Sequence, residues 1–262
     1  MKHKLNFFCL SALLLLITFS LSSCIKQTPT GTKVICLVDL SESGNTMQRK
    51  EFYRNIIRDT VIPSLGLHDA LIVIPIDNAS VTNSASIFQC DLSKKEFEPE
   101  FASPMEVENL IQKNLKQYKS GLKSEFETSY SQALEKRASY GKATDLFGAI
   151  EQASKMLDSK NRNVVIFLSD MMNYSSQLKM EPGNSSFNRS SLDNAVKKAP
   201  KHSLPGSTAI VLTGELSDTS TDHFNLVKSF WSSYFEQNSI TLYDYSSTST
   251  LKLEELLKSV EK

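Results

Sequence analysis

Five residues with hydroxyl or carboxyl side chains stand where apolar segments of the sequence give way to polar ones. Asp39, Ser41 and Ser43 follow one apolar run. Asp170 ends another, and Thr144 lies in a loop before an amphipathic segment. Carboxylate and hydroxyl oxygens are the ligands that Mg²⁺ prefers, in near-octahedral geometry with several waters retained, and Mn²⁺ accepts similar ligands. The side chains of these five residues are of the types that could bind such a metal.

The apolar runs that precede these residues are expected strands. They are rich in β-branched residues and lack period-two alternation, which is typical of strands buried on both faces of a parallel sheet. The segment 86–90 follows the strand at 70–76 closely enough to form an antiparallel hairpin. In chain order the expected strands span 33–40, 70–76, 86–90, 163–169, 208–212 and 240–243.

Helical segments separate these strands. Their apolar residues recur three and four positions apart, as on the buried face of an amphipathic helix. In chain order the expected helices span 47–62, 105–137, 145–157, 192–199, 222–235 and 251–260. We expect the second of them to be two helices interrupted near Gly121. One helix carries aromatic residues whose spacing favours a buried face over an exposed contact surface: Phe230, Trp231, Tyr234 and Phe235.

The alternation of buried strands and helices predicts the fold class. We expect an α/β fold with a doubly wound, mostly parallel sheet, helices on both faces and one antiparallel edge strand. In such sheets ligands bind beyond the carboxyl ends of the strands, where the strand order reverses. The candidate ligands follow strand ends and are expected there. The polar loop 171–190 is long enough to be functional or mobile.

In these motifs the chain resembles the von Willebrand factor A (vWA) domain family. Residues 39–43, DLSES, match the DxSxS motif of its metal-ion-dependent adhesion site. Residues 141–146, GKATDL, match the loop that supplies a threonine, and 168–170, LSD, match the strand that ends in the last acid. The family often has glycine after that acid, where this chain has Met171.

The resemblance covers residues 33 to about 245 and implies a vWA or Rossmann-like fold. In the family, the two serines and, in one state, the threonine contact Mg²⁺ or Mn²⁺ directly, while the acids hold its waters or move into contact. A partner protein then offers an Asp or Glu carboxylate to complete the metal shell. The resemblance therefore implies a binding module and not an enzyme.

Simpler roles exist for the same residues. Asp39 and Ser41 could cap the next helix, because Asp and Ser are preferred at helix N-caps. Thr144 could likewise be an N-cap, and Asp170 a polar residue that merely ends a strand. Asp145 is expected to order its loop or to sit in the first turn of the following helix, where its charge suits the helix dipole. Asp77 could surround the metal ligands without touching the metal.

Two other functions compete with the binding module. A metal-dependent phosphohydrolase of the haloacid-dehalogenase type also begins with an acid at the end of a first strand, but here Ser41 stands where such enzymes have a second acid. The sequence contains no GxSxG elbow, HExxH helix or P-loop, and its histidines are scattered. The other alternative is a structural lipoprotein whose metal site is vestigial or merely stabilising.

The amino-terminal residues have the layout of a secretory signal, with a positive end, a short apolar core at 10–17 and a small-residue cleavage site. That core is shorter than the roughly 20 apolar residues of a spanning helix. Residues 21–24, LSSC, resemble the lipobox of bacterial lipoproteins. The resemblance implies that residues 1–23 are removed and that Cys24 carries lipid, which anchors the chain in a membrane. An ordinary signal peptide with an incidental cysteine is the alternative.

These assignments divide the chain into a signal peptide (1–23), a lipidated cysteine with a short tether (24–32) and one vWA-like domain (33–262). They predict a location in the bacterial cell envelope. Ile25 and Lys26 lack the acidic signal for retention in the inner membrane, which favours the outer membrane in a Gram-negative cell.

Charge and cysteine content limit the partners and the disulfide bonds that can be expected. Lys and Arg together equal Asp and Glu, at 29 each, and they are interspersed without a basic stripe, so no nucleic-acid partner is expected. Of the four cysteines, Cys9 belongs to the signal and Cys24 to the lipid anchor. Cys36 and Cys90 are expected to be free or buried thiols, with a disulfide between them as the alternative.

Overall fold

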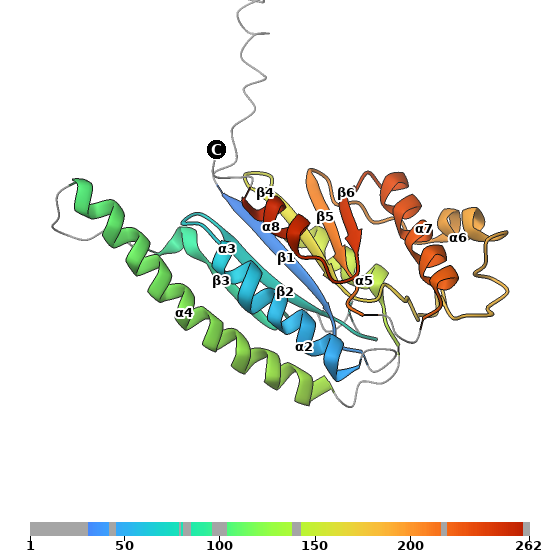
Figure 1. Ribbon diagram of the computed structural model, residues 1–262. Helices are drawn as coiled ribbons and strands as arrows, with labels where there is room; N and C mark the ends of the chain where they lie inside the picture. The colour runs from blue at the N-terminus through green and yellow to red at the C-terminus, as the bar shows by residue number, and fades with distance from the viewer. Residues whose placement is uncertain are drawn as a thin grey trace, which may run out of the picture.

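The structure, a computed structural model, describes residues 31–41, 46–78, 80, 85–95, 104–137, 143–215 and 219–258. Its strands form one six-stranded sheet in the order β3-β2-β1-β4-β5-β6 (Figure 1). All neighbours are parallel except β3, which pairs antiparallel with β2 at one edge. The predicted fold class is therefore confirmed. The strands are β1 (Thr32–Asp39), β2 (Ala70–Ile76), β3 (Phe88–Asp91), β4 (Arg162–Leu168), β5 (Ser207–Leu212) and β6 (Thr241–Ser246).

Strand β1 lies inside the sheet and contributes to a core on each face. Val34, Cys36 and Val38 pack into one core, and Ile35 and Leu37 into the other. Because both faces are covered, the strand has no polar side, and this explains its unbroken apolar sequence. Burial of each such aliphatic side chain contributes about 1.5–3 kcal/mol to folding. Strand β1 is thus a rigid support for the residue at its carboxyl end, Asp39.

Helices cover both faces of the sheet (Figure 1). Helices α2, α3, α4 and α8 pack on one face, and α5, α6 and α7 pack on the other. Their bounds are α2 Met47–Ile56, α3 Ile62–Ser64, α4 Pro104–Arg137, α5 Leu146–Met156, α6 Leu192–Lys198, α7 Thr221–Gln237 and α8 Leu251–Lys258. A short 3-10 turn, η2 (Leu92–Lys94), follows β3.

The helical segment after β1 continues from Met47 to Ser64, with a π-helical turn, η1 (Ile57–Val61), between α2 and α3. Pro63 lies two residues after the end of this turn. Proline has no N–H to donate, and its ring collides with the carbonyl four residues earlier in a regular α-helix. We attribute the widened turn to this proline.

Helix α4 is continuous for 34 residues, so the predicted interruption near Gly121 is wrong. Gly121 is on the exposed side of the helix, where a Cβ would meet open space. Glycine there costs about 1 kcal/mol relative to alanine. The opposite side of α4 buries Leu122, Phe126 and Tyr130, and this packing outweighs the low helix propensity of one residue.

The aromatic residues of α7 are core residues, as predicted. All four side chains are fully buried and pack against one another: Phe230, Trp231, Tyr234 and Phe235. The first three also pack against Phe147 of α5. The alternative interpretation of these residues as an exposed contact surface is therefore wrong.

The two cysteines in the described part of the chain are not joined. Cys36 is a buried thiol and Cys90 a half-buried one, and both are free. The expectation of two separate thiols is therefore confirmed.

Among the residues that the structure describes, no helix is long and apolar enough to cross a membrane. The expected signal peptide and Cys24 lie outside the described residues.

Candidate metal centre

The carboxyl ends of β1 and β4 lie side by side at the point where the strand order reverses. Chain order runs outward from β1 through β2 to β3 on one side, and from β4 through β5 to β6 on the other. Such a reversal opens a crevice beyond the strand ends. Asp39 is the last residue of β1, and Asp170 follows β4 by two positions. The two acids therefore reach the same crevice, as the sequence predicts.

Asp39 is fully buried, and hydrogen bonds hold both of its oxygens. Its Oδ1 accepts a bond of 3.0 Å from the backbone N–H of Ser41, and its Oδ2 accepts one of 2.8 Å from the hydroxyl of Ser169. The N-cap of α2 is Thr46, whose side chain accepts a bond from the N–H of Arg49. Asp39 and Ser41 are therefore not the caps of this helix, and that simpler role is wrong for them.

Thr144 joins Ser41 directly. Its Oγ1 donates a hydrogen bond of 2.9 Å to Ser41 Oγ, and both residues are buried. The N-cap of α5 is Asp145, whose carboxylate accepts a bond of 2.9 Å from the N–H of Gly148. Thr144 is therefore not a helix cap. Asp145 is the cap, and its side chain neither orders the loop nor lies in the first turn, the two roles expected of it.

The segment after Asp170 holds the Thr144 loop in place. Thr144 and Tyr174 exchange two backbone hydrogen bonds, of 3.1 and 2.9 Å. The side chain of Asn173 accepts a bond of 3.0 Å from the N–H of Leu146 and donates one of 2.6 Å to the carbonyl of Leu178. This first part of the 171–190 loop thus forms part of the site. Sequence reasoning missed Asn173, because nothing in its local pattern indicates a partner on α5.

Asp170 is paired with a buried arginine that the sequence pattern did not indicate. Its Oδ1 accepts a bond of 2.9 Å from the N–H of Met172, and its Oδ2 lies 3.3 Å from Nη1 of Arg49. The two side chains of this ion pair are only 4% and 5% exposed. Arg49 also donates from Nε to the carbonyl of Glu215, at 2.6 Å. Asp170 is therefore more than a polar residue that ends a strand.

Met171, which follows Asp170, has an unusual backbone conformation. Its φ is +62°, in the left-handed region that is unfavourable for residues with a Cβ. The side chain is fully buried, and the Met171 carbonyl accepts a bond of 2.8 Å from the indole of Trp231. Packing therefore holds a strained residue beside the candidate site.

The electrostatic environment of the crevice disfavours two bare carboxylates. Burial raises the pKa of Asp39, although hydrogen bonds from Ser41 and Ser169 partly oppose it. Burial and, after it, the charge of Asp39 raise the pKa of Asp170. Burial and the charges of both acids also raise the pKa of Tyr53. A cation in this crevice would stabilise the ionised acids.

Ser43 and Asp77 are the remaining residues that the sequence places at or near the site. Ser43 lies outside the described residues. Asp77 is buried in an ion pair with Arg137, at 2.9 Å, while its carbonyl accepts a bond of 3.1 Å from the N–H of Asp145. Asp77 therefore supports the Thr144 loop through its backbone.

The described residues contain no group of three or more His, Cys, Asp or Glu side chains that could hold a metal. A metal at the crevice would therefore rely on hydroxyl oxygens beside two acids. Asp39, Ser41, Thr144 and Asp170 provide such a set of hard oxygen donors, which suits Mg²⁺ or Mn²⁺ better than a softer metal.

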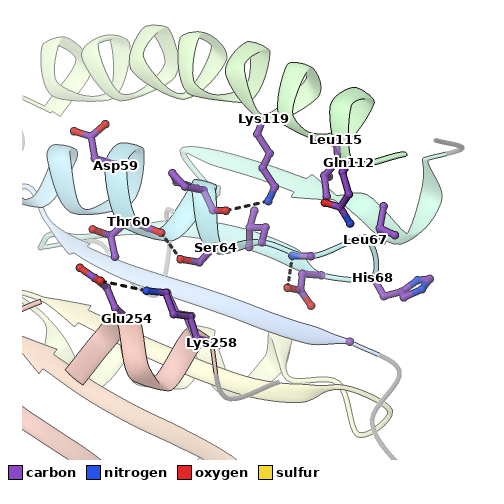
Figure 2. A pocket seen from close by; sticks show the side chains of 16 residues that line it. Asp59, Thr60, Ser64, Leu67, His68, Gln112, Leu115, Lys119, Glu254 and Lys258 are labelled. Atoms are coloured by element: carbon purple, nitrogen blue, oxygen red, sulfur yellow. Dashed lines mark hydrogen bonds and ion pairs between the residues drawn. The ribbon is translucent and has the colours of Figure 1, made fainter. Parts of the chain in front are cut away.

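A cavity of about 760 Å³ lies at the opposite end of β1, next to Gly31. Figure 2 shows that its walls come from the segment 59–69, which includes α3, and from α4 and α8. Its polar groups largely contact one another: Lys119 donates to the carbonyl of Pro63 at 2.9 Å, and Lys258 lies 3.6 Å from Glu254. This cavity contains none of the predicted ligands, and the crevice remains the better candidate site.

No protein-family model matches the sequence, and no curated protein matches it. Solved structures with a similar chain path include a mutant of the PilB minor pilin from Streptococcus sanguinis, at 9% identity and a TM-score of 0.48. They also include proximal thread matrix protein 1 from the mussel byssus, at 13% identity and a TM-score of 0.38. Each comparison covers 89% of this chain, but only 61% of the pilin chain and 48% of the mussel chain. Likenesses this distant carry no argument about function.

Proposed function

We propose that this chain is a lipid-anchored, vWA-like binding module that captures a protein partner through a divalent metal. The observation that carries the proposal is the buried cluster of Asp39, Ser41, Thr144 and Asp170 at the strand ends. Three separate segments of the chain supply these side chains, and the hydroxyl of Thr144 bonds to that of Ser41. These four side chains are buried, and none of them caps α2 or α5.

In the proposed mechanism, the hydroxyls of Ser41, Ser43 and Thr144 would hold Mg²⁺ or Mn²⁺, and the carboxylates of Asp39 and Asp170 would bind it directly or through water. The metal supplies a positive centre that attracts an Asp or Glu carboxylate of the partner. Hydrogen bonds from Ser41 and Ser169 orient Asp39, and the backbone of Tyr174 orients Thr144. The module performs no reaction.

Metal binding is tested by calorimetric titration of Mg²⁺ and Mn²⁺ into the purified full-length chain, with Asp39→Ala as the control. We expect binding by the wild type and none by the variant. Absence of binding by the wild type would overturn the proposal. Stable metal binding without any metal-dependent partner would favour the structural lipoprotein.

Partner capture is tested with paired peptides that differ only in Glu against Gln, or Asp against Asn. We expect the acidic member of a binding pair to be retained by the immobilised chain in Mg²⁺ and released by EDTA. Equal retention of the acidic and amide members would contradict capture through the metal.

The lipid anchor rests on the sequence alone. We propose that Cys24 carries it and that the module acts at a membrane of the bacterial cell envelope. Metabolic labelling with a radioactive fatty acid should mark the wild type and not Cys24→Ser, and only the wild type should sediment with membranes. Labelling of both would place the lipid on another residue.

The phosphohydrolase alternative lacks a second acid, because Ser41 stands in that place and accepts the bond from Thr144. Turnover of a general phosphatase substrate by the wild type, lost in Asp39→Asn, would nevertheless restore it.

A further inference from the structure

The side chain of Arg49 is buried next to the candidate site and contacts three other residues. Its Nε donates to the carbonyl of Glu215, and its Nη1 pairs with Asp170. Next to its side chain is Gly214, where a Cβ would come within 3.1 Å of Arg49 Cγ and where φ is +71°. A residue with a side chain would be strained there and would crowd the arginine. The glycine therefore leaves room for a guanidinium that is almost completely buried.

The position of Arg49 matters for any metal in the crevice. Asp39 and Asp170 carry two negative charges when ionised, and Arg49 supplies one positive charge against them. An arginine and a divalent metal that share one carboxylate repel each other, and this repulsion is strong where water is largely excluded. At the same time, a buried ionised acid without a cation is unfavourable. Arg49 thus stabilises the crevice without metal and opposes the arrival of a metal.

From this geometry we infer that Arg49 is an internal counter-cation that holds one oxygen of Asp170 and thereby sets the metal affinity of the site low. This inference rests on the proposed metal-binding function. When metal binds, Arg49 keeps its hold on Oδ2, so Asp170 has its other oxygen for the metal or for the metal's waters. Arg49 is a positioning residue here, since it acts on the metal through Asp170.

Removal of the Arg49 charge should have opposite effects on the metal affinity and on the melting temperature in EDTA. Replacing Arg49 with an uncharged residue of similar length removes the repulsion, so metal affinity should rise. The same change leaves Asp170 without this partner in the metal-free protein, so the melting temperature in EDTA should fall. A purely structural arginine would instead lower both quantities when removed, because the crevice would lose its shape.

The experiment compares Arg49→Met, Arg49→Lys and Arg54→Met in the full-length chain by calorimetric titration of Mg²⁺ and by melting in EDTA and in Mg²⁺. Arg54→Met is the matched control, because Arg54 lies on the same helix and pairs instead with the glutamates Glu51 and Glu127. We expect Arg49→Met to bind Mg²⁺ about tenfold more tightly than the wild type or better. Its melting temperature should be low in EDTA and largely restored in Mg²⁺. Arg49→Lys keeps the charge and should bind as weakly as the wild type, and Arg54→Met should bind unchanged.

The outcomes separate this inference from the proposed function. Wild-type binding with equal or weaker binding by Arg49→Met would overturn the inference and leave the function intact. No binding by the wild type or by any variant would overturn the function and the inference together. Binding by Arg49→Met alone would overturn the proposed function, because the wild-type site would hold no metal, although it would show that Arg49 opposes metal binding. If Arg49→Met folds neither in EDTA nor in millimolar Mg²⁺, the inference fails, because a metal should replace the missing charge.

Discussion

The hydroxyl of Thr144 donates a hydrogen bond of 2.9 Å to the hydroxyl of Ser41, although 103 positions separate the two residues in the chain. Ser41 follows the central strand β1, and Thr144 precedes α5. Two hydroxyl groups that are hydrogen-bonded inside a protein are also close enough to bind the same metal ion. The pair therefore ties the two halves of the candidate site together.

Thr144→Val tests the role of this hydroxyl, because valine keeps the shape of threonine and lacks the oxygen. We expect a loss of about 1 kcal/mol in the free energy of unfolding, from the lost hydrogen bond. Mg²⁺ affinity should fall by roughly tenfold or more, as when a residue supporting a metal site is removed. Thr144→Ser retains the hydroxyl and should bind Mg²⁺ nearly as the wild type does. Equal metal binding by the valine and serine variants would remove Thr144 from the site.

The stability of the metal-free chain should depend on pH because of Asp170. Burial and then the charge of Asp39 raise its pKa to about 7. The folded chain therefore holds this proton more tightly than the unfolded chain, whose carboxyl pKa is about 4. The resulting stability is present in full below the unfolded pKa and is lost as the pH rises through the folded pKa.

In EDTA, the wild type should accordingly melt at a lower temperature near about pH 8 than near about pH 5.5. Bound Mg²⁺ stabilises the ionised acids and should reduce this difference. Asp170→Asn cannot titrate, and its melting temperature should vary less with pH. A variant with the same pH profile as the wild type would assign the dependence to other groups.

The strand-end acids of the site could be predicted because apolar runs mark β1 and β4 plainly and because parallel strands end at one edge of a sheet. Thr144 required the vWA resemblance as well, since a threonine before a helix is also typical of a cap. The structure excludes the cap, because Asp145 occupies that position, and the role of Thr144 as a metal ligand stays a prediction.

Arg49 was not predicted, for a physical reason. It lies among other charged residues in α2, and only tertiary contacts distinguish it from its exposed neighbours. Its burial depends on the carbonyl of Glu215, 166 positions away. Helix α4 was predicted as two helices for a related reason: the weak propensity of Gly121 is local, and the packing that overrides it is not.

Asn173 is expected to be a structural support of the site. Asn173→Ala would leave the buried N–H of Leu146 without its partner, which costs about 1–3 kcal/mol in the free energy of unfolding. Because this loop also holds Thr144, Mg²⁺ affinity should fall with stability. Asn184→Ala is the control, since Asn184 lies in the same loop and its contacts remain within that loop. Denaturant unfolding should show a clearly larger loss for Asn173→Ala, and equal losses would contradict the supporting role.

Met171 provides a test of backbone strain beside the site. Met171→Ala loses a buried side chain and should reduce the free energy of unfolding by about 2–5 kcal/mol. Met171→Gly loses the same packing but relieves the positive φ. We therefore expect the glycine variant to be more stable than the alanine variant by about 1 kcal/mol, the reverse of their usual order. An alanine variant at least as stable as the glycine variant would show that φ is not strained there.

The most direct test of the account is the melting temperature of the full-length chain in EDTA and in millimolar Mg²⁺, beside Asp39→Asn. The amide has the shape of the carboxylate and removes one buried charge, so the variant should melt in EDTA no lower than the wild type does. We expect Mg²⁺ at about a hundred times its Kd to raise the wild-type melting temperature by roughly 5–10 °C and to leave the variant unchanged. No rise in the wild type, or an equal rise in both proteins, would contradict a metal site at Asp39.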